Sequence, residues 1–356
     1  MKLARLVHVA VSQFSRGQAR LYMADSILFS VNAVFPIVLV AAFGFFCRKN
    51  GTLTDEFLTI GNKFCFKYCF FAMMFCNVYK IESFAAIRWN SVVTSLIIVM
   101  LLFVAGLVFV LLFVPDRTQK GVILQAVFRS NFAIIGIPLA TNIFGEEGQI
   151  AASLISAFSV PLFNVLAVIS LVVFTRDEKS SAKVQVMSII KKILTNPLIL
   201  GTACGMVCIG LRPFCGEWRL ASGDLRFVYK AIDALAVIAP WLSLIILGGR
   251  FRFSAIKRLL PQISVTVVAR LIFAPVVGMT LSYFLPGWLN LAPLSGADYA
   301  ALFALFGSPV AIASVAMADQ MGSDSELAGQ ILVWTTLLSA FTVFAQTALL
   351  RHIGLF

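Results

Sequence analysis

Residues 129–139 read RSNFAIIGIPL, and residues 305–310 read LFGSPV. Each stretch places Gly-x-Pro in the middle of a long apolar run. A proline has no N–H, so the carbonyl four residues earlier, at Ile134 and at Leu305, loses its partner within the helix. In hydrocarbon such a break is tolerated only where the freed groups face protein, water or a ligand. The two stretches therefore predict broken membrane helices that mark a binding site.

The composition around these breaks is that of an integral membrane protein. Of the 356 residues, 60% are hydrophobic and 12% are charged, and the mean hydropathy is +0.96. A soluble domain averages roughly 25% charged residues. Ten apolar stretches are each about long enough to cross a bilayer, and they cover residues 27–47, 57–78, 91–114, 122–143, 150–174, 197–213, 230–249, 263–285, 299–319 and 327–350.

The two broken stretches are the fourth in each set of five. A basic linker at 175–196 separates the first repeat, 27–174, from the second, 197–356. An odd number of spans in each half gives the two halves opposite orientations in the membrane. We therefore expect an all-α membrane protein of ten transmembrane helices, arranged as two inverted five-helix repeats with broken crossing helices 4 and 9.

The net charge of +12 follows membrane topology and does not require a nucleic-acid partner. Lys and Arg are more frequent in the loops after spans 1, 3, 5 and 7 than on the opposite side. The positive-inside rule then places the central linker in the cytoplasm and both termini outside. The expected location is the plasma or inner membrane. The N-terminal extension, 1–26, is either an amphipathic surface helix or sequence that precedes a true start at Met23.

Ionisable groups deep in a bilayer are costly and default to functional hypotheses. Lys67, Arg129 and Arg270 are the deep ones, and each has an alternative reading in which it snorkels or caps carbonyl groups. Asp233 and Asp319 lie near span ends. Basic groups without acidic partners, next to half-helix N-termini, favour an anion. No histidine lies in a span and no Cys-x-x-Cys pair occurs, so we expect no metal, no cofactor and no enzyme.

Several motifs, in this order and spacing, resemble the auxin efflux carrier family, which includes the plant PIN-type carriers and microbial carriers of malate or malonate. They are the segment Asn131–Leu139, Pro36 with Gly44, Asn196-Pro197-Leu198, Ala239-Pro240 through Leu247-Gly248, Arg270 through Pro275, and Pro309 followed by Gly322. The likeness covers about residues 27–350. Ser130 replaces the proline that PIN-type carriers have before the asparagine, and the linker is short, which favours the microbial members.

The resemblance implies a scaffold of spans 1, 2, 6 and 7, with the potential to dimerise, and a transport domain of the other spans. It also implies that helices 4 and 9 cross at Pro138 and Pro309, and that Asn131 helps to hold a substrate carboxylate. We expect a secondary carrier that moves a small carboxylate by alternating access, with protons as a candidate partner. The candidate substrate-binding residues are Lys67, Arg129, Asn131, Gly136, Pro138, Gly307, Ser308 and Pro309.

Other functions remain open at this point. One is a sodium-coupled symporter of the bile-acid type, which has a related crossed-helix fold; sodium sites want several oxygen ligands, often carboxylates, and the crossings supply few. Another is a membrane-embedded enzyme, which would need a nucleophile and base or metal ligands. A third is a receptor or structural protein in which the broken helices are packing kinks.

Overall fold

The computed structural model describes residues 16–80, 88–175, 187, 190–214 and 219–356, and the described chain is predominantly helical. In chain order the helices are α2 (Arg16–Lys49), α3 (Asp55–Phe64), η1 (Cys65–Cys69), α4 (Phe70–Tyr79), α5 (Trp89–Phe113), α6 (Arg117–Phe128), η2 (Phe132–Gly136), α7 (Ile137–Phe174), α9 (Pro197–Leu211), η3 (Arg212–Phe214), α10 (Arg226–Arg250), α11 (Ser254–Val268), η4 (Ala269–Phe273), α12 (Ala274–Trp288), α13 (Gly296–Gly307), α14 (Ala313–Gln320) and α15 (Ser325–His352).

Five segments of the described chain are long and apolar enough to cross a membrane. They are Trp89–Phe113, Phe132–Phe174, Arg226–Arg250, Ser254–Trp288 and Ser325–His352. The second of these contains a sharp bend, because Phe144 and Gly145 leave helical geometry and Gly145 has a positive φ of 62°. Glycine adopts that conformation without a steric penalty. The bend separates the expected spans 122–143 and 150–174.

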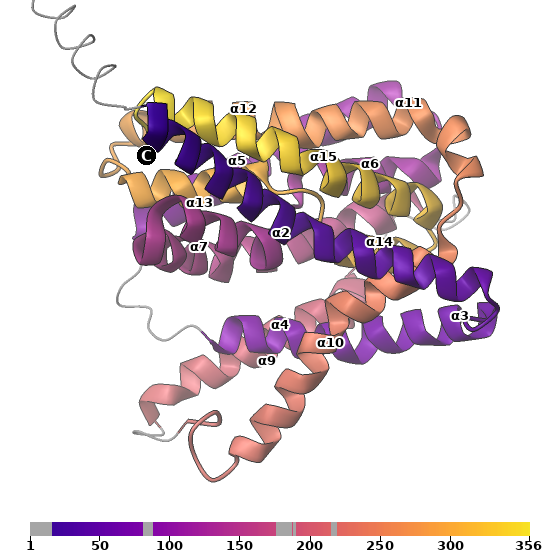
Figure 1. Cartoon of the computed structure of the whole chain (residues 1–356). Coiled ribbons are helices and arrows are strands. Elements are labelled where there is room, and N and C mark those ends of the chain that lie inside the picture. Colours follow the sequence, from indigo (N-terminus) through magenta and orange to yellow (C-terminus); the bar gives the residue numbers. More distant parts are fainter. Residues whose placement is uncertain (1–15, 81–87, 176–186, 188–189, 215–218) are drawn as a thin grey trace, which may run out of the picture.

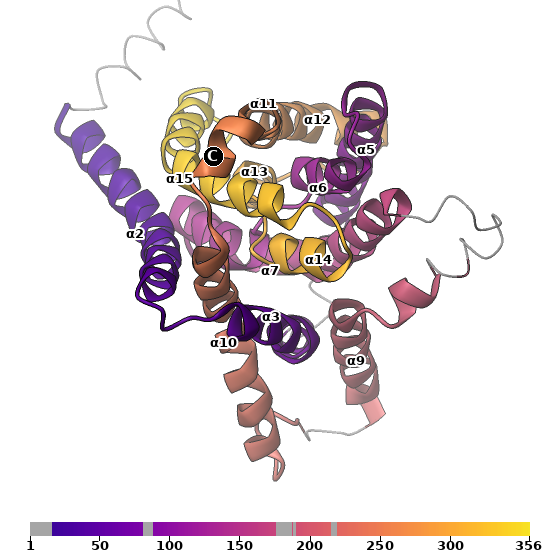
Figure 2. The same cartoon turned by 90° about the vertical axis from the view of Figure 1, so that its right-hand side faces the viewer.

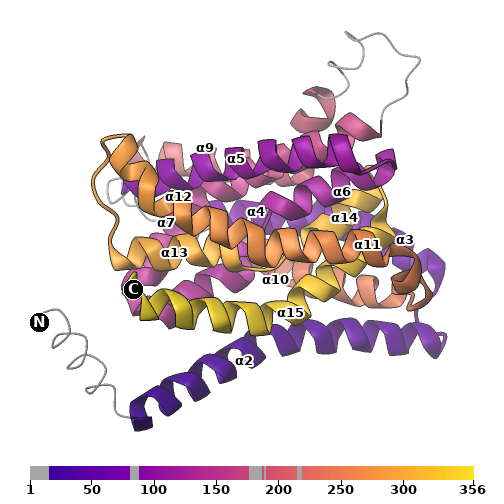
Figure 3. The ribbon, with the colours of Figure 1, turned by 90° about the horizontal axis from the view of Figure 1, so that it is seen from above.

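The first long helix, α2, starts at Arg16, so residues 16–26 of the expected N-terminal extension are continuous with the first expected span. Residues 1–15 lie outside the described part, as does most of the expected linker 175–196. Pro36 lies within α2, and α2 bends midway along its length in Figure 3. A proline inside a helix removes one hydrogen bond and bends the helix.

The helices form two groups. In Figure 1, α3, α4, α9 and α10 lie together in the lower half, and α5, α6, α7 and α11–α15 lie in the upper half. Figure 2 shows the same division from the side, with α2 along one edge of the molecule. The helix α2 contacts α10 in the first group and α15 in the second. The largest continuous apolar core lies mainly within the second group.

Small residues bring the helices of the first group close to one another and to α2. A Cβ on Gly248 of α10 would lie 1.8 Å from the carbonyl oxygen of Ala41 in α2. A Cβ on Gly44 would lie 2.1 Å from the carbonyl oxygen of Ile245. Such contacts are typical of helix pairs in membranes, where packing rather than water exclusion drives association. Gly201 likewise brings α9 against the backbone of Phe71.

The described chain contains three π turns: η1 and η4 lie within otherwise continuous helices, and η2 begins the helical segment that continues as α7. Such turns are rare and frequently occur at functional sites. The turn η4 carries Arg270, the turn η2 follows Asn131, and the turn η1 carries Lys67. The π turns therefore coincide with three of the polar positions in the apolar stretches.

Candidate functional site

Two helix breaks meet at the centre of the second group. One break separates α6 from η2, and the other separates α13 from α14. Within each break the chain is extended, and Ser130 of the first break forms an isolated antiparallel bridge with Val310 of the second. The Asn131 N–H donates to the Pro309 carbonyl at 2.7 Å. The backbone groups freed by one break are thus partly satisfied by the other, as a break inside a membrane requires.

The first break lies further upstream than the sequence indicates. The chain leaves helical geometry at Arg129–Asn131, whereas Pro138 is the second residue of α7 and is exposed. The π turn η2 continues directly into α7, so the extended stretch ends at Asn131, before the helix reaches the proline. The expected crossing at Pro138 is therefore wrong, and the crossing is made by Ser130 and Asn131. The crossing at Pro309 is found as expected.

The C-terminal carbonyls of α13 have defined partners. The Leu305 carbonyl, which Pro309 leaves without an N–H, accepts from Arg270 Nη2 at 3.2 Å. The same guanidinium donates to the carbonyls of Phe306 and Ser308. Ser308 Oγ donates to the Ala304 carbonyl at 2.6 Å. Arg270 is fully buried, so the carbonyl-capping alternative is the one that the structure shows for it.

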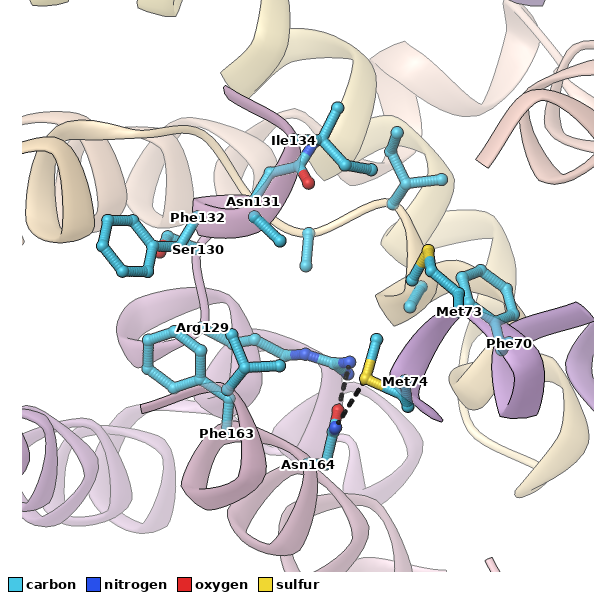
Figure 4. A pocket seen from close by; sticks show the side chains of 15 residues that line it. Phe70, Met73, Met74, Arg129, Ser130, Asn131, Phe132, Ile134, Phe163 and Asn164 are labelled. Atoms are coloured by element: carbon cyan, nitrogen blue, oxygen red, sulfur yellow. Dashed lines mark hydrogen bonds between the residues drawn. The ribbon is translucent and has the colours of Figure 1, made fainter. Parts of the chain in front are cut away.

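The helices that resume after the two breaks are η2, which continues as α7, and α14. Their N-terminal ends face a small cavity of about 40 Å³. Figure 4 shows this cavity with Arg129 and Asn131 on the extended segment between α6 and η2. The first N–H groups of a helix have no partner within the helix and carry a partial positive charge. The lining residues come from α4, the two breaks and α7, and they are Phe70, Met73, Met74, Arg129–Ile134, Val160, Phe163, Asn164 and Ala311–Ala313.

Arg129 contributes a whole positive charge to this cavity. Its side chain is 3% exposed, and its Nη2 donates to Asn164 Oδ1 at 2.9 Å. Asn164 Nδ2 in turn contacts Met74 Sδ at 3.2 Å, which connects α7 to α4. Within the described chain, no carboxylate forms an ion pair with Arg129. A buried charge without a counter-ion is costly.

Two further polar groups at the crossing are buried without a hydrogen-bond partner. They are the side-chain Nδ2 of Asn131 and the Oγ of Ser130. A buried donor without a partner costs about 1–3 kcal/mol, and such groups in a folded protein call for an explanation. A ligand or water in the adjoining cavity would supply the missing partner.

A family model described as "Membrane transport protein" matches residues 29–345. The chain belongs to this family of membrane transporters, of the auxin efflux carrier type. The resemblance found in the sequence is thereby confirmed. The protein is a multi-pass helical membrane transporter. A search of curated proteins finds no match to this sequence.

The two glycines predicted for the transporter's site serve packing. A Cβ on Gly136 would lie 2.3 Å from the Phe132 ring and 3.1 Å from the carbonyl oxygen of Ala304 in α13. A Cβ on Gly307 would lie 2.9 Å from the Phe303 ring. Neither glycine lines the cavity. Gly136 therefore allows the first broken helix of the membrane transporter to approach α13 closely, whereas Gly307 makes room for a ring of its own helix.

Lys67 is not brought to the crossing. The lysine lies on η1 and is exposed, with its ammonium 5.2 Å from the centre of the Tyr68 ring. Cys65 and Cys69 occupy the buried face of the same turn. Of the eight expected residues, Arg129 and Asn131 line the transporter's cavity, while Gly136, Gly307, Ser308 and Pro309 build the crossing around it.

The structure adds residues that the sequence left aside. Ser130, which stood out only as a departure from the family pattern, forms the bridge itself. Asn164 of α7 accepts a hydrogen bond from Arg129 and also lines the cavity. Ala311–Ala313 line the cavity through the start of α14. Alanines carry no polar signal, so only the position after Pro309 could have indicated them.

Proposed function

We propose that this transporter is a secondary carrier of a small organic anion, and that the carboxylate binds at the crossing next to Arg129 and Asn131. The observation that carries the proposal is a buried guanidinium without a carboxylate partner beside the unpartnered Nδ2 of Asn131, in one cavity. The ends of two half-helices face the same cavity. Each N-terminus carries about +0.5 elementary charge.

The charge at the site suggests the substrate class. Two half-helix N-termini and Arg129 together bring about +2 elementary charges to the cavity. A dicarboxylate carries a matching charge, whereas a monocarboxylate leaves part of it uncompensated. The Ser130 hydroxyl and the Asn131 amide add donors without charge. We therefore propose that small dicarboxylates are preferred over monocarboxylates of the same size.

We further propose ten transmembrane helices in two inverted five-helix repeats. The group α3, α4, α9 and α10, with α2, would act as a scaffold and could support a homodimer, and the other group would move as a transport domain. The close glycine contacts between α2 and α10 favour a rigid scaffold, and the shared apolar core favours a rigid transport domain. We place the central linker in the cytoplasm, on the charge distribution.

Alternating access is supported by the sizes of two cavities. The cavity at Arg129 is about 40 Å³ and holds only a few water molecules, so an organic acid enters it only after α4 moves away from the breaks. A second, polar cavity of about 590 Å³ lies between α3 and α10 on one side and α14 and α15 on the other. In this cavity the Asp319 carboxylate of α14 accepts hydrogen bonds from Arg250 of α10, at 2.7 Å, and from Asn62 of α3. Movement between the groups would break these contacts.

The test is uptake into proteoliposomes of purified protein, measured for a panel of mono- and dicarboxylates. Each substrate is tested with and without gradients of pH and of sodium. The proposal predicts uptake of small carboxylates, led by dicarboxylates, that does not require sodium. Sodium-dependent uptake would instead support the symporter of the bile-acid type. No uptake of any carboxylate, with the protein correctly folded, would contradict the proposal.

A further inference from the structure

Arg270 lies at the point where the C-terminal ends of both broken helices converge. Its Nε donates to the Ser308 carbonyl at 2.9 Å, and its Nη2 donates to those of Leu305 and Phe306 at 3.2 and 2.6 Å. Its Nη1 donates to the Val127 carbonyl, in the last turn of α6, at 3.0 Å. The side chain is 0% exposed. One guanidinium therefore holds four carbonyl oxygens from two helix ends.

The charges at this point balance without an acidic residue. Each helix C-terminus carries about −0.5 elementary charge, so the two ends together carry about −1. The guanidinium supplies +1, and within the described chain no carboxylate forms an ion pair with it. A ring of carbonyl oxygens is also the environment that binds a desolvated metal cation in a membrane protein. In this chain the Arg270 guanidinium occupies the position among the carbonyl oxygens that such a metal cation would need.

We propose that Arg270 is a built-in cation of the crossing, which fills a carbonyl-lined site and thereby removes the need for a dissociable cation there. Arg270 is a positioning residue, since it does not line the cavity at Arg129. It fixes the end of α6, from which Arg129 follows directly, and the end of α13, from which Pro309 reaches Asn131. The consequence for anion transport rests on the proposed function, but the cation site itself does not.

The geometry indicates why an arginine suits this position. Its planar fork donates in several fixed directions, and it stays charged when buried. The π turn η4 carries the side chain toward α6 and α13, and Ala274 and Pro275 continue the helix as α12. A lysine would supply the charge but fewer directed donors. A methionine would fill a similar volume and leave all four carbonyls without that donor.

The experiment uses the purified full chain in detergent and compares wild type with Arg270→Ala and with the control Arg258→Ala. Arg258 pairs with Glu326 at an exposed position, away from the crossing. Thermal unfolding midpoints are measured with millimolar methylguanidinium, sodium or choline chloride, present from solubilisation onward. We expect methylguanidinium to raise the midpoint of Arg270→Ala by several degrees and to leave wild type and Arg258→Ala unchanged. Sodium should not affect wild type relative to choline.

An equal effect of methylguanidinium on all three proteins, or a midpoint of Arg270→Ala equal to that of wild type, would overturn the proposal. If Arg270→Ala does not fold, Arg270→Lys and Arg270→Met decide. We expect Arg270→Lys to fold and to retain partial uptake, and we expect the uptake by Arg270→Met to be at least tenfold lower than that by Arg270→Lys. Equal uptake by the two variants would overturn the proposal. The unfolding measurement needs no substrate, so its outcome is independent of whether the carried anion is a carboxylate.

Discussion

Asn131 uses its backbone and its side chain differently. The backbone N–H holds the crossing together through Pro309, whereas the side-chain Nδ2 has no partner. Asn131→Ala keeps the backbone contact, so we expect the free energy of unfolding to change by about 1 kcal/mol or less. Uptake should fall by at least roughly tenfold, because the substrate loses a buried donor. Thermal unfolding and initial uptake rates measure the two effects.

The matched control is Thr347→Val, which removes a different buried polar group without a partner, the Thr347 hydroxyl, on α15 and outside the cavity. This variant should transport like wild type. Wild-type uptake by a well-folded Asn131→Ala protein would remove the side chain from the binding site.

Arg129 and Lys67 differ in their surroundings although both are basic residues in apolar stretches. Arg129→Gln should raise the apparent KM for the anion by roughly 10- to 100-fold, because a charge-assisted hydrogen bond is worth about 1.5–3 kcal/mol. Lys67→Gln should leave the KM within about twofold, since the ammonium is exposed. Concentration-dependent uptake measures both constants. Similar KM values for the two variants would show that the buried charge does not select the anion.

The sequence predicted this part of the site unevenly. Deep charge and an amide beside a break identified Arg129 and Asn131, because polar groups in hydrocarbon require partners. The sequence did not distinguish Lys67, which is exposed, from the buried Arg129 and Asn131. Whether a lysine faces the protein interior depends on the rotation of its helix, and the π turn η1 changes that rotation locally.

At the scale of helices, one of the two prolines coincides with a helix break and the other does not. Pro309 lies within the extended segment after α13, whereas Pro138 lies in the first turn of α7. The break before Asn131 instead coincides with the backbone pairing of Ser130 and Val310. That pairing joins residues far apart in the sequence, and no local pattern encodes it.

The pairing of α2 with α10 depends on close backbone contact. Gly248→Ala would place a methyl group 1.8 Å from the Ala41 carbonyl oxygen, so we expect destabilisation of about 1–3 kcal/mol by overpacking. Gly210→Ala in α9 is the control, because its Cβ would have no neighbour within 4 Å; it should be neutral or slightly stabilising. Thermal unfolding of the purified variants is the measurement. An unchanged midpoint for Gly248→Ala would show that the two helices can separate freely.

At the scale of the whole molecule, the apolar composition predicted a helical membrane protein, because hydrophobic length is a strong signal in membranes. Five segments of the described chain are long and apolar enough to cross a membrane, and the arrangement of ten spans stays a prediction. The division into two groups of helices was expected only from the family resemblance. Contacts such as Arg250 with Asp319 join α10 and α14, and the spacing of these two residues in the sequence carries no information about the contact.

The orientation of the chain in the membrane can be tested by labelling single cysteines from outside the cell. In a cysteine-free background, Ser180→Cys in the linker should resist an impermeant thiol reagent in intact cells and react after permeabilisation. His352→Cys near the C-terminus should react in intact cells, since the positive-inside rule places it outside. Labelling of Ser180→Cys in intact cells would reverse the proposed orientation.

The central claim is that the crossing binds the carried anion through Arg129 and Asn131. Equilibrium binding of the best dicarboxylate from the uptake panel, radiolabelled, tests it on the purified wild type and on Arg129→Gln, Asn131→Ala and Thr347→Val. We predict that the first two variants weaken binding at least roughly tenfold each, while Thr347→Val binds like wild type. Wild-type affinity in both Arg129→Gln and Asn131→Ala, with intact folding, would contradict the claim.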